Sequence, residues 1–312
     1  MNTHLVIGAG PVGTRVALLL AEAGHPVRVV TRSGSGPEHP LVERVAADAA
    51  DAPRMRSLAS GAAAVYNCAH PAYTRWDTAW PPIASALLEA AAASGSVLAT
   101  VSNLYGYGPV TGPMGAHTPL APTDHKGRVR ARMWTDALAA HQTGRVRVVE
   151  VRASDYADAG VSSHLARNAP AVLAGRTAWV MGAADQEHTW TTTQDTARLL
   201  VAAAADDSAH GQPWLVPSPP PRTPREALVD VAAAAGSRPP KIRVLGPRAL
   251  RTVGLVVPFM KELAGTAYQF TAPFVVDDSA TRAHFGWEPQ AWDETVQRIV
   301  GEARSGAHSR VG

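Results

Sequence analysis

The sequence predicts a doubly wound α/β fold, in which helices flank a parallel β-sheet, followed by a smaller and mostly helical lobe. Short β-branched runs alternate with Ala- and Leu-rich helical patterns through the first half of the 312 residues. A glycine-rich turn directly follows the first of these runs. After Arg152 the alternation weakens, and helical patterns dominate the C-terminal part.

The individual elements follow from run length and periodicity. Five apolar runs are too short for helices and are predicted as strands, at 4–7, 27–30, 64–68, 97–101 and 146–151. Helical patterns lie between and after them, at 13–23, 53–60, 83–94, 127–141, 224–235, 248–264 and 292–304. The proline-rich segment 212–225 is predicted as a loop.

Composition excludes several classes of protein. Hydrophobic residues make up 46% of the chain and charged residues 18%, which is enough for a sizeable core. A net charge of +3 does not suggest binding to nucleic acid or to a membrane surface. No apolar stretch is long enough to span a membrane, and the early first strand leaves no room for a signal peptide, so we expect a cytoplasmic protein.

Few residues suit a metal site or a hydrolase. The single cysteine, Cys68, permits neither an intrachain disulfide nor a cysteine cluster. The twelve histidines lack paired ligand spacing, and we expect no metal. The H-E-x-x-H, G-x-x-x-x-G-K-[ST] and G-x-S-x-G motifs are absent from the sequence.

A dinucleotide fingerprint follows the first strand. Residues 8–13 read G-A-G-P-V-G and open a helix, which is the context that the fingerprint requires. Gly8 permits the tight turn, Gly10 lets the backbone approach a pyrophosphate, and Gly13 allows close helix packing. With Pro11 and Val12 they begin a helix whose first N–H groups suit an anion. The alternative is a glycine turn without a ligand.

The end of the second strand favours NADP(H) over NAD(H). An acidic residue there would bind a ribose 2′-hydroxyl, whereas an arginine accommodates a 2′-phosphate. This strand ends in Thr31, Arg32 and Ser33, without an acid. Arg32 could instead be an exposed loop residue. Asp48, in A-A-D-A-A-D, follows an expected third strand between the runs at 27–30 and 64–68, which makes 64–68 the fourth strand. It is a candidate for the adenine amino group or for a helix N-terminus.

The chain resembles the short-chain dehydrogenase/reductase superfamily, in an atypical form of its extended, NAD-dependent epimerase/dehydratase-like branch. The resemblance covers nearly the whole chain and rests on the order and spacing of several motifs. These are the glycine loop, A-D-A-A-D, V-Y-N-C-A at 65–69, V-S-N-L-Y-G-Y-G-P at 101–109, R-A-S-D-Y at 152–156, H-T-W-T-T-T-Q-D at 188–195 and V-D-D-S-A-T-R-A-H-F-G-W-E-P at 276–289.

The resemblance implies a domain organisation and an assembly. It implies a Rossmann-type dinucleotide-binding domain at 1–155 with a return segment near 188–205, and a substrate-binding lobe at 156–312. The substrate would lie between them, over the nicotinamide. Cys68 and Ala69, in the loop after the fourth strand, would border the cofactor. It also suggests a homodimer through the helices at 83–94 and 127–141.

Two departures from the family pattern affect the chemistry. The glycine loop is one residue shorter than the usual G-x-x-G-x-x-G. Lys126 and Arg130 stand where the family has the Tyr and Lys of Tyr-x-x-x-Lys. Arg130 could hold a ribose hydroxyl, and Lys126 could stabilise oxyanion charge or exchange a proton if its pKa were lowered. Alternatively Lys126, with Arg128 and Arg132, forms a solvated helix face.

A replacement phenol stands in the loop after the fifth strand. If Tyr107-Gly108 matches the family's terminal Tyr-Gly, Asn103 takes the usual Ser/Thr position and Tyr105 follows two residues later. Asn103 could orient a carbonyl, and Tyr105 could donate or accept a proton. In the other register Val101 would take that position, without chemistry. Tyr105 could also merely pack against the nicotinamide.

Further residues are candidates for contact with the substrate. Five are predicted on the basis of their loops, namely His70, Tyr73, Trp76, Asp155 and Trp190. His70 could relay a proton or simply be hydrogen-bonded. Asp155 replaces a substrate-contacting asparagine of the family, and its carboxylate would repel a nucleotide-sugar diphosphate. With Trp80, the aromatic residues suit an aromatic or hydrophobic substrate.

These features predict an NADP(H)-dependent oxidoreductase acting on a carbonyl or alcohol of a small or medium organic molecule. Hydride transfer would occur beside Asn103 and Tyr105. One alternative is a redox-neutral epimerase or dehydratase that retains its nicotinamide cofactor. Another is a catalytically inactive protein that senses NADP(H).

Overall fold

The computed structural model describes residues 3–308 and divides the chain into two compact units. The first unit comprises Met1–Gly108, Pro119–Ala153 and Thr196–Val216. The second comprises Pro109–Thr118, Ser154–Asp195 and Pro217–Gly312. The chain therefore returns to the first unit twice, at Pro119 and at Thr196, and leaves it for the last time after Val216.

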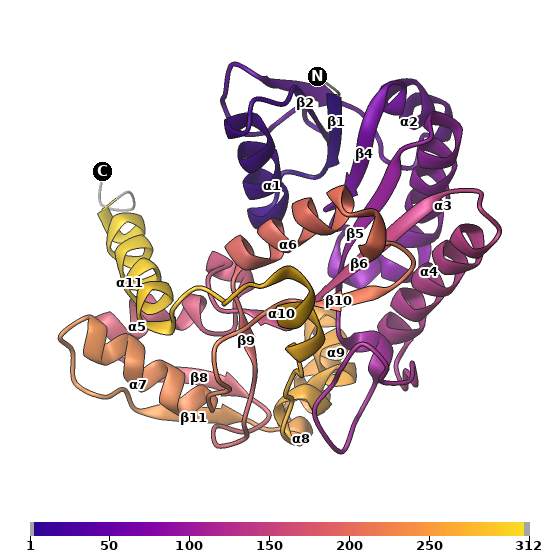
Figure 1. Cartoon of the computed structure of the whole chain (residues 1–312). Coiled ribbons are helices and arrows are strands. Elements are labelled where there is room, and N and C mark those ends of the chain that lie inside the picture. Colours follow the sequence, from indigo (N-terminus) through magenta and orange to yellow (C-terminus); the bar gives the residue numbers. More distant parts are fainter. Residues whose placement is uncertain (1–2, 309–312) are drawn as a thin grey trace. The chain divides into compact units, whose positions relative to one another are not determined.

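The first unit is built on a seven-stranded sheet with the strand order β10-β6-β5-β4-β1-β2-β3 (Figure 1). All of its neighbouring strands pair in parallel. The strands are β1 (Thr3–Ile7), β2 (Val27–Thr31), β3 (Val42–Ala46), β4 (Ala62–Asn67), β5 (Val97–Asn103), β6 (Arg147–Ala153) and β10 (Pro213–Leu215). The order reverses beside β1, so the loop that follows β1 lies where doubly wound folds bind ligands.

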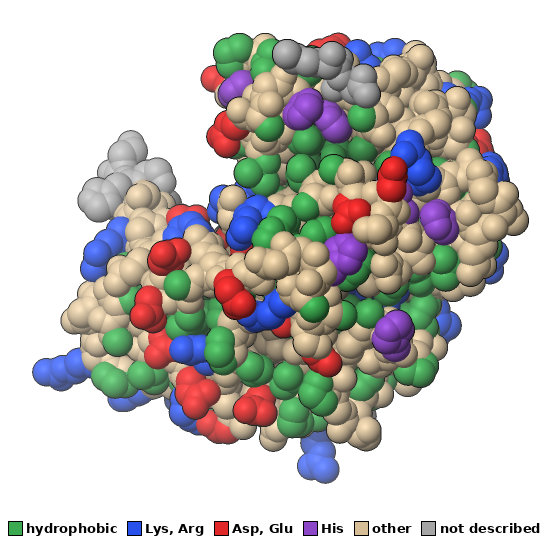
Figure 2. Space-filling model, viewed as in Figure 1, with side chains coloured by type: hydrophobic (Ala, Val, Ile, Leu, Met, Phe, Trp, Pro, Cys, Tyr) green, Lys and Arg blue, Asp and Glu red, His purple; other side chains and the backbone are tan. Residues whose placement is uncertain are grey.

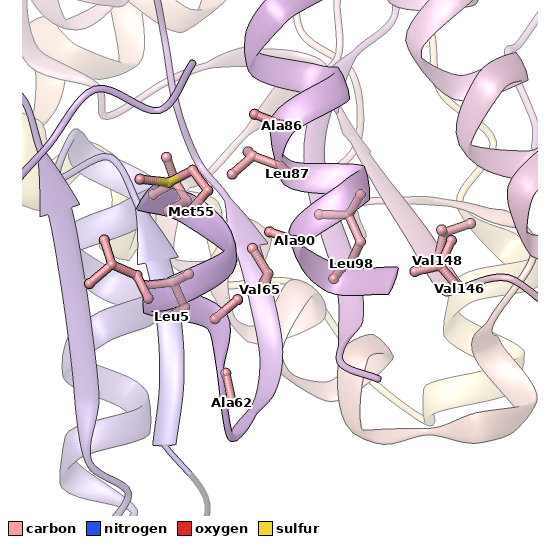
Figure 3. Close-up of a cluster of buried hydrophobic side chains, with 14 of the residues drawn as sticks. Leu5, Met55, Ala62, Val65, Ala86, Leu87, Ala90, Leu98, Val146 and Val148 are labelled. Atoms are coloured by element: carbon pink, nitrogen blue, oxygen red, sulfur yellow. The ribbon is translucent and has the colours of Figure 1, made fainter. Parts of the chain in front are cut away.

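Helices cover both faces of this sheet, as the predicted fold class requires. The helices α2 (Ala52–Ala59), α3 (Trp76–Ser94) and α4 (His125–Gln142) pack on one face, and α1 (Pro11–Glu22) lies on the other, with α6 (Thr193–Ala205) beyond it (Figure 1). Figure 3 shows Leu5, Val65 and Leu98 on the strands meeting Met55 and Leu87 on the helices. Burial of this interface is the main source of stability in the unit.

Three predicted features of the first unit were wrong or incomplete. The edge strand β3 was expected before Asp48 but was given no bounds, because Glu43 and Arg44 give it an exposed, non-alternating pattern. Pro213–Leu215 was predicted as loop but pairs with β6, since proline is tolerated in a short edge strand. Helix α3 begins at Trp76 rather than at residue 83, and Pro81 and Pro82 lie inside it. They are the sixth and seventh residues of the helix, beyond its first turn, so each removes one i→i−4 hydrogen bond.

The second unit is mostly helical, with two short two-stranded sheets. Its strands are β7 (Asp155–Tyr156) paired with β9 (Trp190–Thr191), and β8 (Ala178–Met181) paired with β11 (Ile242–Leu245). Its helices are α5 (Ala169–Leu173), α7 (Pro224–Ala234), α8 (Pro247–Gly254), α9 (Pro258–Gly265), α10 (Ser279–Phe285) and α11 (Trp292–His308). The predicted helix 248–264 is broken between α8 and α9, because Pro258 disfavours helical backbone at the preceding residue.

Within the described residues, none of the helices combines the length and apolar character that a membrane span needs. Basic and acidic side chains are interspersed on the face that Figure 2 shows. This distribution accords with the small net charge of +3.

Candidate active site

The glycine loop after β1 forms a cradle that admits a ligand. Gly8 has a φ of 98°, and a Cβ there would lie 2.6 Å from the carbonyl oxygen of Cys68. A Cβ on Gly13 would overlap the carbonyl oxygen of Gly8. A Cβ on Gly10, in contrast, would meet no atom within 4 Å. Gly8 and Gly13 are thus needed for the fold itself, whereas Gly10 leaves open space where a pyrophosphate would approach.

The first turn of α1 completes this cradle. Gly10 is the N-cap residue with extended backbone, and Pro11 occupies the first helical turn. Val12 and Gly13 follow it, and both are buried. The first N–H groups of a helix lack partners within that helix and carry partial positive charge, so they suit an anionic group. The residues present therefore fit the diphosphate of a dinucleotide.

The loop after β2 presents hydroxyl groups and one guanidinium. The Thr31 hydroxyl donates to the carbonyl oxygen of Ser35 at 2.9 Å, and the Ser33 hydroxyl donates to the Ser35 hydroxyl at 3.0 Å. Arg32 and Ser33 are exposed. Within the described residues Arg32 makes no ion pair, so its charge is available to a ligand. The arrangement suits a 2′-phosphate, for which arginine is well matched.

Asp48 and Cys68 have local structural roles. An Asp48 carboxylate oxygen accepts a hydrogen bond from the Ala50 amide at 2.9 Å, which closes a turn before α2. The N-cap of α2 is Asp51, whose carboxylate accepts from the Arg54 amide at 3.0 Å, so the helix-terminus alternative for Asp48 was wrong. Burial raises the pKa of the Cys68 thiol to about 12, and the thiol stays protonated at neutral pH. Ala69 follows it, half-buried.

Asn103 and Tyr105 lie together at the carboxyl end of β5. The Asn103 side-chain oxygen accepts a hydrogen bond from the Tyr105 amide at 3.2 Å. Tyr105 begins a short 3₁₀ helix (Tyr105–Tyr107), and its hydroxyl accepts a hydrogen bond from the Tyr73 hydroxyl at 3.3 Å. Gly127 allows α4 to approach, because a Cβ there would overlap the carbonyl oxygen of Tyr105. Two phenols, one donating to the other, therefore stand beside an amide.

Lys126 and Arg130 share one buried face of α4. Lys126 is fully buried, and its Nζ donates to the carbonyl oxygen of Tyr73 at 2.6 Å and lies 4.1 Å from the centre of the Tyr73 ring. The Arg130 guanidinium lies 4.8 Å from the Trp76 ring and 4.3 Å from the Trp80 ring. Its Nη1 donates to the Val101 carbonyl oxygen at 3.4 Å. The predicted solvated helix face is therefore wrong for Lys126.

The two other basic residues of this helix behave as the solvated-face alternative predicted. Arg128 and Arg132 are exposed, and Arg132 pairs with Asp136 at 2.7 Å. The buried positions differ because aromatic rings cover them: guanidinium and ammonium groups are attracted to the faces of tyrosine and tryptophan. That attraction offsets part of the cost of burying two positive charges.

The tryptophans of α3 organise these aromatic contacts. Trp76 and Trp80 are buried, their rings 6.1 Å apart and almost perpendicular. The Trp76 ring stacks 6.0 Å from that of Tyr105, and the ring of His70 meets its edge at 5.8 Å. His70 is exposed, but desolvation by its neighbours, with the charge of Arg130, lowers its pKa. His70 is therefore a neutral imidazole at neutral pH.

A buried polar network below this cluster was missed by sequence reasoning. Glu150 and Arg152 are both under 5% exposed and pair at 2.7 Å. Arg152 Nη1 also donates to the hydroxyl of Tyr107 at 2.7 Å. Burial raises the pKa of Tyr107, so this phenol stays protonated. The V-V-E-V-R pattern of β6 placed both charges on one strand face, but no sequence feature indicated their partner.

In the second unit, a carboxylate holds two histidines. Asp155 Oδ2 lies 3.0 Å from His188 Nε2, and Oδ1 lies 3.8 Å from His164 Nε2. The His188 ring stacks on Phe270 at 4.7 Å. Burial opposes ionisation of Asp155, but the hydrogen bond from His188 and the nearby positive charges outweigh it and lower the pKa of Asp155. Burial lowers the pKa of His164 to about 4.

Trp190 completes this part of the second unit. It is buried, and its indole N–H donates to the carbonyl oxygen of Arg222 at 3.0 Å. Its neighbour in the β7–β9 register is Asp155. The R-A-S-D-Y motif at 152–156 and the H-T-W-T motif at 188–191 are therefore neighbours in the structure. Sequence reasoning selected Asp155 and Trp190 but missed His164, which lies in the loop after β7, and His188, whose partner Asp155 is remote in sequence.

The parallel sheet, the glycine cradle after β1 and the phenol beside Asn103 define a nicotinamide-dependent protein of the short-chain dehydrogenase/reductase type. Residues 4–216 match the model of the NAD dependent epimerase/dehydratase family. This match spans more than half of the chain, and the chain belongs to that family. It is accordingly an enzyme of the NAD-dependent epimerase/dehydratase type, with a nicotinamide cofactor.

Solved structures of other proteins share the fold. The dTDP-glucose 4,6-dehydratase of Bacillus anthracis, in complex with NAD, is 16% identical, with a TM-score of 0.81 and coverage of 99% of this chain and 98% of that chain. The UDP-glucose 4-epimerase of Thermotoga maritima, with UDP-glucose, is 16% identical, with a TM-score of 0.80 and coverage of 98% and 99%. The enzyme WbmH of Bordetella bronchiseptica, in complex with NAD+, is 21% identical, with a TM-score of 0.75 and coverage of 97% and 99%. None of the curated proteins matches the sequence.

Proposed function

We propose that this enzyme is an NADP(H)-dependent oxidoreductase that interconverts a carbonyl and an alcohol on a small or medium organic molecule. The observation that carries this proposal is the hydrogen-bonded pair of phenols, Tyr73 and Tyr105, beside Asn103. They belong to the same unit as the glycine cradle. The pair supplies a proton donor in a family member that lacks the usual catalytic tyrosine.

In this proposal the cofactor is held by backbone and by loop donors. Gly8, Gly10 and Gly13 border the diphosphate, and Arg32 and Ser33 bind the 2′-phosphate. The bound nicotinamide supplies or accepts the hydride at the substrate carbon. A contribution of Asp48 to the adenine, and of Cys68 and Ala69 to the cofactor pocket, stays a prediction.

The proton follows a separate route through the phenols. During reduction the Tyr105 hydroxyl donates its proton to the carbonyl oxygen, and the Asn103 amide orients that oxygen. The Tyr73 hydroxyl, which already donates to Tyr105, stabilises the phenolate that results and can pass it a proton. Oxidation of the alcohol reverses these transfers. Each reduction thus adds one hydride and one proton across the carbonyl bond.

Lys126 and Arg130 support this arrangement by their contacts. Because Lys126 Nζ is hydrogen-bonded to the Tyr73 carbonyl oxygen, we assign it to holding the Tyr73 loop. Its positive charge, 4.1 Å from the Tyr73 ring centre, also favours negative charge on the phenols. The Arg130 guanidinium contacts both the Trp76 ring and the Trp80 ring and holds them in place. Its contact with the ribose stays a prediction.

The predicted substrate is not a nucleotide sugar. Repulsion of a diphosphate by the Asp155 carboxylate stays a prediction, and in the structure this carboxylate is held by His188 and His164. His70, Trp76 and Trp190 stay predicted substrate contacts, and aromatic residues suit a hydrophobic molecule. In this proposal the substrate therefore differs from the sugar nucleotides that the structural neighbours bind. A homodimer through residues 83–94 and 127–141 is also proposed, and sedimentation analysis tests it.

The family match favours a second candidate, a redox-neutral epimerase or dehydratase that keeps its cofactor bound. The two candidates differ in what happens to the cofactor. In one experiment the purified enzyme is denatured and the supernatant is assayed for nicotinamide nucleotide. In a second experiment the native enzyme is incubated with NADPH and a panel of hydrophobic aldehydes and ketones. Net loss of absorbance at 340 nm with free cofactor supports the oxidoreductase. Stoichiometric bound cofactor without net turnover supports the second candidate.

A further inference from the structure

The second unit carries a loop of exposed apolar residues between helices α8 and α9. Leu255 and Val256 are 87% and 83% exposed, and Val257, which follows them, is also exposed. The two helices pack against each other, and Leu250 of α8 and Leu263 of α9 are buried. The helices are therefore anchored in the unit, whereas the loop that joins them protrudes into solvent.

The turn itself does not require apolar side chains. Gly254 ends α8 and Pro258 begins α9, and these two residue types account for the break between the helices. Connections between helices are normally polar, because a run of exposed apolar side chains promotes association and contributes nothing to the core. The run Leu255–Val257 therefore indicates a surface that a binding partner covers.

Basic residues accompany this apolar loop in the sequence. Residues 238–261 contain six Lys or Arg and no Asp or Glu. Because the whole chain has a net charge of +3, the residues outside this segment carry a net charge of −3. The small net charge of the chain thus conceals a local concentration of positive charge, and such a concentration attracts anionic partners.

The basic side chains of this segment are available to a partner. Five of them are exposed, namely Arg238, Lys241, Arg243, Arg248 and Lys261. Within the described residues none of these five forms an ion pair. Arg243 lies opposite Trp179 of β8 in the strand register, and its guanidinium is 5.7 Å from the exposed Trp179 ring. The surface thus combines positive charge with aliphatic and aromatic side chains.

We propose that this surface, the loop Leu255–Val257 with the basic residues of 238–261, docks on an anionic lipid bilayer. The apolar loop would enter the interfacial region, while the Lys and Arg side chains would stay among the lipid headgroups. Each Lys or Arg held close to such a surface strengthens binding about fivefold. The apolar loop and the basic residues therefore act together on one partner.

A bilayer suits this surface better than a protein does. A protruding loop can enter a fluid interface directly, whereas a protein partner would need a pocket of matching shape to cover it. A second copy of the chain is disfavoured by charge. In a symmetric dimer the same patch of each chain meets the other, so that six basic residues would face six more, and like charges repel at close range.

The test of charge measures sedimentation of the full chain with vesicles. These are made of phosphatidylcholine alone or of equal parts of phosphatidylcholine and phosphatidylglycerol. Binding to the mixed vesicles should be about tenfold tighter or more, and added salt should weaken it. Lys241→Gln combined with Arg248→Gln should weaken it by about tenfold or more. The control combines Arg54→Gln with Arg56→Gln, which removes the same charge from the exposed side of α2 and should bind like the wild type.

The test of the apolar loop compares two valines. Val256→Ser should weaken binding to the mixed vesicles about fivefold, because this side chain would be buried in the interfacial region. The matched control is Val161→Ser, at a position that is 82% exposed, in the short 3₁₀ helix Gly160–Ser162 of the same unit and outside the basic segment. It should bind like the wild type. Thermal unfolding followed by circular dichroism establishes that every variant is folded.

Several results would overturn this proposal. These are absence of binding to the mixed vesicles, equal binding to both kinds of vesicle, and equal effects of Val256→Ser and Val161→Ser. Soluble poly-glutamate tests the alternative of an acidic protein: if it binds as tightly as the vesicles and with the same dependence on Val256, a protein is the partner and the proposal fails. The readouts use neither cofactor nor substrate, so they are independent of the proposed oxidoreductase activity.

Discussion

The glycine loop allows folding and cofactor binding to be separated by two single-atom changes. Gly10→Ala adds a methyl group where no protein atom lies within 4 Å, on backbone with φ −70° and ψ −175° that alanine adopts freely. The cost to stability should be at most about 1 kcal/mol, the usual penalty for alanine at an N-cap. The methyl group would nonetheless occupy the approach of the diphosphate, and we expect cofactor affinity to fall at least tenfold, or about 1.4 kcal/mol.

Gly13→Ala should have the opposite profile. The added methyl group would overlap the Gly8 carbonyl oxygen, which is backbone and cannot rotate away. Overpacking of this kind costs typically 1 to 3 kcal/mol, and we expect a loss of about 3 kcal/mol here. For a chain of this size the melting temperature should fall by about 4 to 5 °C.

Both variants can be assayed without knowledge of the substrate. Energy transfer from tryptophan to NADPH reports cofactor affinity, and thermal unfolding monitored by circular dichroism reports stability. Wild-type affinity in Gly10→Ala would refute the placement of the diphosphate at this loop. Wild-type stability in Gly13→Ala would refute the close packing of α1 against β1.

Three further predictions rest on single side chains. Tyr105→Phe should lower kcat about 10²-fold to 10⁴-fold with little change in cofactor Kd, whereas Lys126→Met should lower kcat less and Arg130→Met should mainly weaken cofactor binding. Steady-state kinetics on a substrate that the enzyme turns over would measure these effects. Full activity of Tyr105→Phe would remove this phenol from the mechanism. Because the pKa of His164 is lowered to about 4 in the folded state, stability should be lost as the pH falls below about 6.5, by about 2 kcal/mol between about pH 7.5 and about pH 5. His164→Gln should remove that loss in urea unfolding, and an unchanged pH dependence would contradict the assignment. Tyr107→Phe should cost about 1 to 3 kcal/mol in the same assay, since Arg152 loses its buried acceptor, and an unaltered midpoint would contradict it.

The parts of the fold that depend on local sequence could be predicted. The β-branched runs gave the five central strands, and the glycine loop could be placed because its three glycines, the preceding strand and the following helix are contiguous in sequence. The short edge strand β10 could not be predicted, since three residues beginning with Pro213 carry no periodicity and pair only because β6 lies beside them. The break at residues 255–257, between α8 and α9, could be predicted only by giving Pro258 more weight than the otherwise helical pattern around it.

The candidate site shows the same division between local and remote information. Asn103 and Tyr105 are adjacent in sequence and were found together, and the i, i+4 spacing placed Lys126 and Arg130 on one helix face. Their burial could not be foreseen, because the aromatic rings that cover them come from Tyr73, Trp76 and Trp80, some 50 residues earlier. His188 was missed for the same reason, since its partner Asp155 precedes it by 33 residues.

The most direct test of the account is an equilibrium titration of the wild type and Arg32→Ala with NADPH and with NADH. The charge of Arg32, beside Ser33 and without an acidic neighbour at the end of β2, should favour the 2′-phosphate. We predict that the wild type binds NADPH at least tenfold more tightly than NADH, and that Arg32→Ala weakens NADPH alone by about one to two decades. Equal affinity of the wild type for the two cofactors would contradict the NADP(H) assignment, and failure to bind either would contradict the nicotinamide site itself.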